Sequence, residues 1–140
     1  MTKKCKSRLL KAMKNDEVYI YETSEEDCRY WFKVINEEIF DNQLTFPDKI
    51  DIRWRRKTYA YHVTTRYSDG TISTMLCMSK KYKSEKFFIQ VLAHEMIHEW
   101  QAMYGEPLGH GPSFLQWEEK FNKKGMVLYK GTKSDEKAMV

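Results

Sequence analysis

The stretch FIQVLAHEMIHEW, residues 88–100, carries the H-E-x-x-H pattern inside a predicted helix. Ser84 is a residue type that caps helices and Gly105 is one that ends them, so we expect the helix between these two residues. A helix turns by about 100° per residue, which places the two histidines of the pattern one turn apart in height and about 40° apart around the axis. Both imidazoles can therefore reach one zinc ion.

Glu95 follows the first histidine of the pattern and lies beside the metal-binding face. From there its carboxylate can contact a water molecule held by the ion, which is where a general base must stand. His94 and His98 are thus predicted to bind one catalytic Zn2+ ion, and Glu95 is predicted to be the catalytic base. This chemistry is typical of a zinc metalloendopeptidase.

A catalytic zinc site needs a third protein ligand. The metzincin spacing is excluded, because it requires glycine and histidine where the chain has Gln101 and Tyr104. Glu118 lies about where a thermolysin-like site would have its glutamate, and it stays open as a ligand. His110 is the preferred ligand, because its flanking glycines let the backbone approach a metal closely and neutral imidazole is a common zinc ligand.

The rest of the chain predicts a single domain of the α+β class. A capping box at Thr23 and Glu26 starts a helix that runs to about residue 41. Residues 49–79 change to alternating and β-branched patterns, which indicate three strands in an antiparallel meander. A further helix is expected after Pro112, where proline suits a first helical turn. Short strands are expected at residues 17–21 and 126–129.

Composition narrows the classes of protein. A length of 140 residues fits one compact domain, and 41% hydrophobic with 31% charged residues describe a water-soluble chain. The three cysteines are widely spaced, so neither a disulfide framework nor a cysteine-based zinc ribbon is predicted. No apolar run suits a membrane span or a signal-peptide core. We expect a cytoplasmic monomer, or a nuclear or nucleoid-associated one if it acts on DNA, that is not secreted.

The chain has a formal net charge of +4, and its basic residues concentrate in two places. The first is the N-terminus, so we divide the chain into a basic N-terminal arm (1–22), the domain (23–130) and a flexible C-terminal tail (131–140). The second is residues 49–67, where cations are interleaved with aromatic rings, as a surface for single-stranded nucleic acid requires. The candidate nucleic-acid contacts are Arg53, Trp54, Arg55, Arg56, Lys57 and Tyr59.

The sequence resembles the SprT/Spartan family of zinc metalloproteases. The resemblance rests on HEMIH at residues 94–98 and on GHGP at residues 109–112, followed by Phe114. Upstream, FKVINEEIF at residues 32–40 and then Leu44 and Ile52-Arg53-Trp54 resemble the first helix and first strand of the family. The similarity covers about residues 24–130. It implies a zincin-like domain in which a small three-stranded antiparallel sheet packs with the H-E-x-x-H helix and two further helices.

By the same resemblance His94, His98 and His110 bind zinc and Glu95 is the base. Members of the family cleave proteins crosslinked to DNA, with proteolysis that depends on DNA, so the implied partners are a protein or peptide substrate and single-stranded DNA. Two features depart from the family: the chain lacks its cysteine-based zinc-binding subdomain, and Ala60-Tyr61 stands where Ala-Gly is common. Two alternatives therefore stay open: a minimal zinc peptidase without DNA dependence, and a DNA-binding or adaptor module with an idle protease site.

Two further expectations concern the substrate. The strand at residues 71–78, just before the H-E-x-x-H helix, is expected to be an edge that holds an extended peptide by backbone pairing. Tyr61, His62 and Tyr104 are candidates for the group that stabilises the oxyanion. His62 lies inside a predicted strand and is otherwise expected to be an ordinary strand residue.

Overall fold

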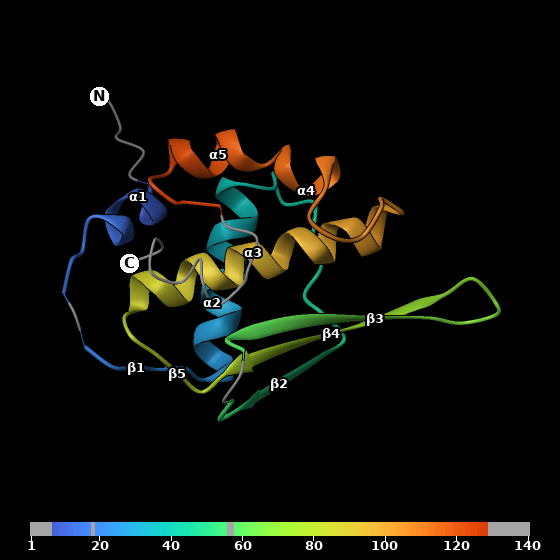
Figure 1. Cartoon of the computed structure of the whole chain (residues 1–140), viewed down its shortest axis with the longest axis horizontal. Coiled ribbons are helices and arrows are strands. Elements are labelled where there is room, and N and C mark those ends of the chain that lie inside the picture. Colours follow the sequence, from blue (N-terminus) through green and yellow to red (C-terminus); the bar gives the residue numbers. More distant parts are fainter. Residues whose placement is uncertain (1–6, 18, 56–57, 129–140) are drawn as a thin grey trace.

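A computed structural model describes residues 7–17, 19–55 and 58–128 of the chain. It has the α+β architecture that the sequence predicts (Figure 1). The elements are, in order, α1 (Arg8–Met13), β1 (Tyr21–Glu22), α2 (Glu25–Glu38), β2 (Lys49–Arg53), β3 (Ala60–Arg66), β4 (Ile72–Ser79), β5 (Lys81–Tyr82), α3 (Glu85–Tyr104), α4 (Pro112–Leu115) and α5 (Glu118–Lys123).

Helix α3 carries the H-E-x-x-H pattern and begins and ends where the sequence predicts. The Ser84 hydroxyl accepts a hydrogen bond from the backbone N–H of Phe87 at 3.0 Å, which satisfies one of the free donors of the first turn. Gly105 closes the helix with a φ of 67°, a left-handed conformation that glycine adopts without strain. Most residues of α3 are buried, because it runs through the middle of the molecule with the sheet on one side and α4 and α5 on the other (Figure 1).

The three-stranded sheet has the order β2-β4-β3 and is mixed. β3 pairs antiparallel with β4, but β2 pairs parallel with β4, so the prediction of an all-antiparallel meander is wrong. β4 is the central strand, and the prediction that residues 71–78 form a peptide-binding edge is wrong as well. The physical reason is the continuous burial of Leu76, Cys77 and Met78, which gives β4 two covered faces. The edges of this sheet are β2 and β3.

The smaller elements depart from the sequence predictions in detail. α2 is capped by Ser24, whose hydroxyl accepts from the N–H of Asp27, and not by Thr23, and it ends at Glu38. The predicted strand at residues 17–21 is reduced to β1, which pairs with β5. The single helix expected after Pro112 is two short helices, α4 and α5. Residues 126–128 form no strand, and Tyr129 and the predicted tail lie outside the described residues.

One core joins the helices to the sheet. α2 and α3 pack together, and α3 packs against β4. α1, which the sequence patterns did not predict, buries Leu9 and Met13 in the same core. Cys28 and Cys77 are buried free thiols. Among the described residues, no helix combines the length and apolarity that a bilayer crossing needs.

Candidate metal centre

Three histidines converge beside the centre of α3. His94 and His98 project from successive turns of the helix, and His110 comes from the loop between α3 and α4. One ring nitrogen from each histidine can be chosen such that all three lie within 4.8 Å of one another. The three ring centroids are 5.1 Å apart in each pair. The arrangement is compatible with one metal ion bound by three imidazoles.

Phe114 packs against all three of these rings. Its ring centroid lies 4.8 Å from that of His94, 5.4 Å from that of His98 and 4.6 Å from that of His110. Phe114 is fully buried in α4, which begins at Pro112 immediately after the histidine loop. A rigid apolar ring behind the three imidazoles limits the directions in which they can turn, so it keeps their nitrogens facing one another.

The loop that carries His110 has the backbone freedom that the sequence suggested. Gly109 has a φ of 117°, a conformation that a residue with a side chain rarely adopts. Glu118, the alternative third ligand, is exposed at the start of α5 and does not belong to the cluster. The geometry therefore favours His110 over Glu118.

Gln101 connects His98 to the His110 loop. Its side-chain oxygen lies 2.8 Å from His98 Nδ1, and its amide nitrogen donates to the carbonyl oxygen of Gly109 at 3.1 Å and to Ser113 Oγ at 2.8 Å. Because an amide oxygen only accepts, Nδ1 of His98 carries the hydrogen, which leaves the lone pair on Nε2. A metal-binding histidine needs this tautomer when Nε2 is the ligand atom.

The protonation state of His98 also suits a ligand. Burial lowers the pKa of His98 to about 4; the nearby His110 and His62 act in the same direction, and the hydrogen bond with Gln101 opposes them. The imidazole is therefore neutral at pH 7, and neutral imidazole is the form that binds a metal.

Glu95 has an oxygen with no partner in the described part of the chain. Its side chain is buried, Oε1 accepts no hydrogen bond, and Oε2 lies 3.8 Å from His94 Nε2. Burial raises the pKa of the Glu95 carboxyl to about 8. A buried carboxyl group with an unsatisfied oxygen calls for a polar partner at that position, such as a water molecule or a cation. Three imidazoles and this carboxyl group are a donor set that fits a divalent metal such as zinc.

A cavity of about 350 Å³ opens onto the histidines. One wall is the edge strand β3, and the other is α3 with the loop that follows it. The cavity is lined by Ala60, Tyr61, His62, Thr64, His94, Glu95, His98, Leu108, Gly109 and His110. Tyr61 lies at this wall and is 42% exposed. Tyr104 points elsewhere, since its hydroxyl donates to the carbonyl oxygen of Gln43.

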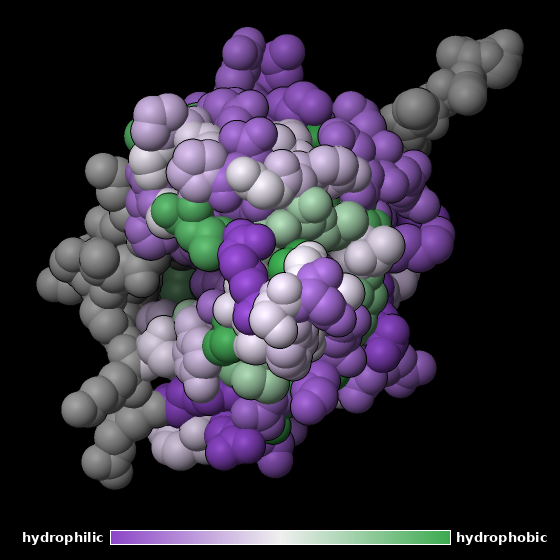
Figure 2. All heavy atoms as spheres, turned by 90° about the vertical axis from the view of Figure 1, so that its right-hand side faces the viewer, coloured by the Kyte–Doolittle hydropathy of each residue, from purple (hydrophilic) through white to green (hydrophobic). Residues whose placement is uncertain are grey.

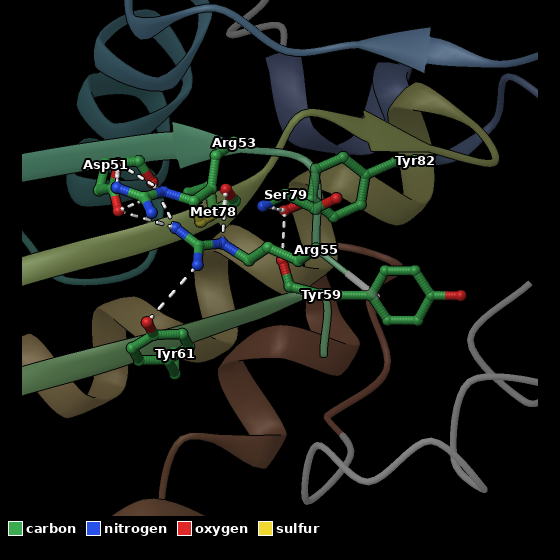
Figure 3. A network of polar contacts seen from close by, with 8 residues as sticks. All are labelled: Asp51, Arg53, Arg55, Tyr59, Tyr61, Met78, Ser79 and Tyr82. Carbon is green, nitrogen blue, oxygen red and sulfur yellow. Dashed lines mark hydrogen bonds and ion pairs between the residues drawn. The ribbon is translucent and has the colours of Figure 1, made fainter. Parts of the chain in front are cut away.

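The candidate nucleic-acid residues fall into two groups, and Figure 3 shows three of them, Arg53, Arg55 and Tyr59. The Arg55 side chain is only 9% exposed and donates to the carbonyl oxygens of Met78 and Asp51, both at 3.0 Å. It joins β2 to β4, and this structural role occupies its guanidinium group. Tyr59 packs edge-on against Phe87, and its carbonyl oxygen accepts from the hydroxyl group of Tyr82 at 2.7 Å.

Arg53 and Trp54 belong to the second group, because the Trp54 residue and the Arg53 side chain are each 66% exposed. The guanidinium group of Arg53 pairs with Asp51 at 3.0 Å, and the Trp54 indole is among the most exposed large hydrophobic side chains described. Arg56 and Lys57 lie outside the described residues. An exposed cation next in sequence to an exposed aromatic ring is typical of a surface that contacts single-stranded nucleic acid, so Arg53 and Trp54 remain candidates.

The end of the molecule at which α3 ends is mainly hydrophilic. Figure 2 shows this face, where hydrophobic side chains form small separate patches between polar ones. Leu108 and Leu115, both exposed, belong to the segment that follows α3. Single exposed apolar side chains are normal on a folded domain.

No motif in the sequence identifies Gln101 or Glu99 as site residues. Both are buried, and both lie on α3 where the surrounding sequence is largely apolar. A polar side chain at a buried position must find a hydrogen-bond partner. The polar residues at these two positions of a largely apolar helix were therefore the signal that could have identified them as site residues.

Comparison with known proteins supports the same interpretation. A search of curated proteins finds no significant match to the chain. The sequence matches the model of the SprT-like family over residues 28–136, which is most of its length and includes the three histidines. This match agrees with the fold and with the histidine cluster, and we conclude that the chain belongs to the SprT-like family.

Proposed function

We propose that the chain is a zinc-dependent endopeptidase that acts on DNA-bound or DNA-crosslinked proteins. The observation that carries the peptidase proposal is the convergence of three imidazoles beside a buried carboxyl group, one oxygen of which has no partner among the described residues. His94, His98 and His110 are the proposed ligands of one zinc ion, and Glu95 is the proposed catalytic base.

The chemistry divides between the ion and the chain. A zinc ion at this position would lower the pKa of a water molecule toward ~7 and polarise a carbonyl group. Glu95 accepts the proton of the attacking water at Oε1, which has no partner in the part of the chain that the structure describes, and then delivers it to the nitrogen of the departing amine. In the metal-free protein burial favours the protonated form of Glu95, and the positive charge of a bound zinc ion would favour the ionised carboxylate that accepts this proton.

The substrate is proposed to lie along β3. This strand is an edge of the sheet, and four of its residues line the cavity beside the histidines. An edge strand offers backbone N–H and C=O groups to an extended peptide, so one segment of substrate can pair with β3 while its scissile bond lies over Glu95. The polypeptide must be locally unfolded to bind in this way.

Gln101 offers a test of the metal centre that does not depend on catalysis. Replacing Gln101 by leucine removes the bonds to His98 and to the His110 loop, so we expect zinc affinity to fall by about 10–100-fold, as with other outer partners of metal ligands. Competition with a chromogenic chelator measures the affinity. Gln116→Leu, at an exposed glutamine, is the matched control and should bind zinc like the wild type. Equal affinities in the two variants would contradict the proposed role of Gln101.

The DNA part of the proposal is tested by cleavage of a DNA-binding protein with and without single-stranded DNA. We expect metal-dependent cleavage that DNA stimulates. Cleavage that DNA does not affect would instead support the minimal peptidase. DNA binding by a zinc-loaded protein that cleaves nothing would support the adaptor module.

Trp54 is the side chain on which we expect a base to stack. Trp54→Ala should weaken binding of a single-stranded oligonucleotide by about 1–3 kcal/mol, roughly 5- to 150-fold in Kd, because stacking on an exposed ring is lost. Fluorescence anisotropy at two salt concentrations measures this change. Tyr30→Ala, at an exposed ring on α2, is the control. Unchanged DNA affinity in Trp54→Ala would remove Trp54 from the DNA contact.

A further inference from the structure

Another cavity, which we call the loop cavity, lies beside the loop that carries His110. It has a volume of about 480 Å³ and is lined by residues of the segment that runs from the end of α3 into α4. Leu108 lines both the loop cavity and the cavity beside the histidines. Gly111, which also lines the loop cavity, directly follows His110. The loop cavity therefore adjoins the proposed metal centre, where the side chain of a substrate residue near the scissile bond can reach it.

Hydrogen bonds fix the walls of the loop cavity relative to the metal centre. Ser113 Oγ donates to the carbonyl oxygen of Pro107 at 2.7 Å and accepts from the side-chain amide of Gln101 at 2.8 Å. The backbone N–H of Glu106 donates to the carbonyl oxygen of Gln101 at 2.9 Å. Because the side-chain oxygen of Gln101 lies 2.8 Å from His98 Nδ1, one residue holds a proposed zinc ligand and the wall of the loop cavity. The cavity is thus formed before any substrate binds.

Glu106 gives the loop cavity its charge. It is the only ionisable side chain among the described residues that line this cavity. It is half-buried, and its carboxylate has no ion pair or hydrogen bond within the described ranges. The other half-buried acidic side chains described do have partners: Asp27 with Tyr21, Glu38 with Ser7 and Lys124, Asp51 with Arg53 and Arg55, and Glu85 with Trp31. A carboxylate that is partly withdrawn from water and unpaired gains free energy when a cation binds it.

The rest of the lining is suited to an aliphatic chain. Pro107, Leu108 and Pro112 contribute apolar surface, and Leu108 is 51% exposed. The side chains of lysine and arginine have an aliphatic stem that packs on apolar surface and a charged end that reaches a polar group. Apolar walls together with one unpaired carboxylate therefore fit a basic side chain, whereas an acidic side chain would be repelled.

We propose that the loop cavity is a substrate subsite for a lysine or arginine side chain near the scissile bond, and that Glu106 determines this specificity. The stem of the basic side chain packs on Leu108 and the two prolines, and its charged end pairs with Glu106. This inference rests on the proposed peptidase function and deepens it, because it names a class of substrate segment. Proteins that bind DNA contact its phosphates through lysine and arginine, so the preference agrees with the substrates proposed above.

The test compares peptides that differ in one charge. A peptide that the wild type cleaves is synthesised with lysine in turn at each position beside the scissile bond. Each lysine peptide is paired with its acetyl-lysine counterpart, which keeps the stem but removes the charge. At one position we expect kcat/KM of the zinc-loaded wild type to be about 5–10-fold higher for lysine, mainly through KM, as for an ion pair partly withdrawn from water. Added salt should reduce this ratio.

Variants of Glu106 assign the preference to its carboxylate. Glu106→Gln keeps the shape of the side chain and removes the charge, so the ratio for lysine over acetyl-lysine should fall to about one. Glu106→Lys should reverse the preference, so that a peptide with glutamate at this position is cleaved faster than the lysine peptide. Glu119→Gln is the matched control, because it removes the same charge from an exposed position on α5 outside the lining, and it should keep the wild-type ratio.

Binding without cleavage gives a second readout. The zinc-loaded Glu95→Gln variant is used, and calorimetry measures its affinity for the lysine and acetyl-lysine peptides. The lysine peptide should bind more tightly by about the same factor as in kcat/KM, because the ion pair with Glu106 forms in the bound substrate as well as in the transition state. Adding Glu106→Gln to this variant should remove the difference.

The outcomes separate this inference from the proposed function. If the wild type is active but treats lysine and acetyl-lysine peptides alike at every position, the inference is overturned and the peptidase function stands. The same conclusion follows if Glu106→Gln keeps the preference, or if Glu119→Gln loses it to the same extent. If the zinc-loaded wild type cleaves nothing, the proposed function fails and the inference fails with it.

Discussion

Glu95→Gln is expected to lower kcat for peptide hydrolysis by about 10²–10⁴-fold while the protein keeps its zinc. Glutamine has almost the shape of the carboxylic acid but cannot accept the proton of the attacking water. The side chain is buried at the wall of the cavity, and its Oε1 has no other partner among the described residues, so none of these residues is placed to take over its task. Steady-state kinetics together with metal analysis of the purified variant provide the measurement.

The control for Glu95→Gln is Glu119→Gln, which removes the same charge from an exposed position on α5 and should leave kcat unchanged.

The thermal stability of the metal-free protein provides a check on folding. Burial raises the folded-state pKa of Glu95 from 4.5 to about 8, so between these pH values the folded protein binds more protons than the unfolded chain and loses stability as pH rises.

The metal-free Glu95→Gln variant lacks this loss of stability with rising pH. It should therefore have a higher Tm than metal-free wild type at pH 8, and the difference should shrink toward pH 4.5. Hydrolysis at the wild-type rate by a zinc-loaded Glu95→Gln variant would contradict the proposed role of Glu95 as the base.

His110→Ala is expected to abolish stoichiometric zinc binding and, with it, hydrolysis. The change removes one of three proposed ligands, and the loss of affinity should exceed the roughly 10–100-fold that accompanies loss of an outer partner such as Gln101. The fold should persist, because His110 is exposed in a loop and Phe114 remains packed in the core. Circular dichroism tests the fold, and zinc analysis after gel filtration tests the binding.

Glu118→Ala is the matched variant for His110→Ala. This change removes the alternative third ligand that the sequence spacing does not exclude. The variant should keep one zinc ion per chain, because Glu118 is exposed on α5 outside the histidine cluster. The opposite result, zinc lost in Glu118→Ala and kept in His110→Ala, would replace the three-histidine site by a thermolysin-like one.

The parts of the fold that the sequence predicts well are those decided by local chemistry. Ser84 and Gly105 bound α3 because capping and the left-handed conformation are properties of single residues. The convergence of His94 and His98 follows from helical spacing. The position of His110 needs more than spacing, since the geometry of a loop depends on its contacts, here those made by Gln101 and Phe114.

The parts that sequence reasoning missed are those decided by tertiary packing. Nothing local distinguishes a meander from an order in which β4 lies between β2 and β3, because the order depends on which strand has both faces covered. Arg55 is a cation in a stretch whose composition is typical of a nucleic-acid contact. Its guanidinium group nevertheless donates to carbonyl oxygens of two neighbouring strands. The pairing of His62 with Glu99 joins residues far apart in the chain, and no periodicity reports such a contact.

The central claim is that one zinc ion, held by the three histidines beside Glu95, makes this chain a peptidase. The most direct measurement is a zinc titration of chelator-treated wild type, with cleavage of a protein substrate followed at each step. The account predicts no cleavage without metal and a rate that rises with added zinc and levels off at one ion per chain. Cleavage that proceeds at the full rate without metal, or a zinc-saturated protein that cleaves nothing, would contradict it.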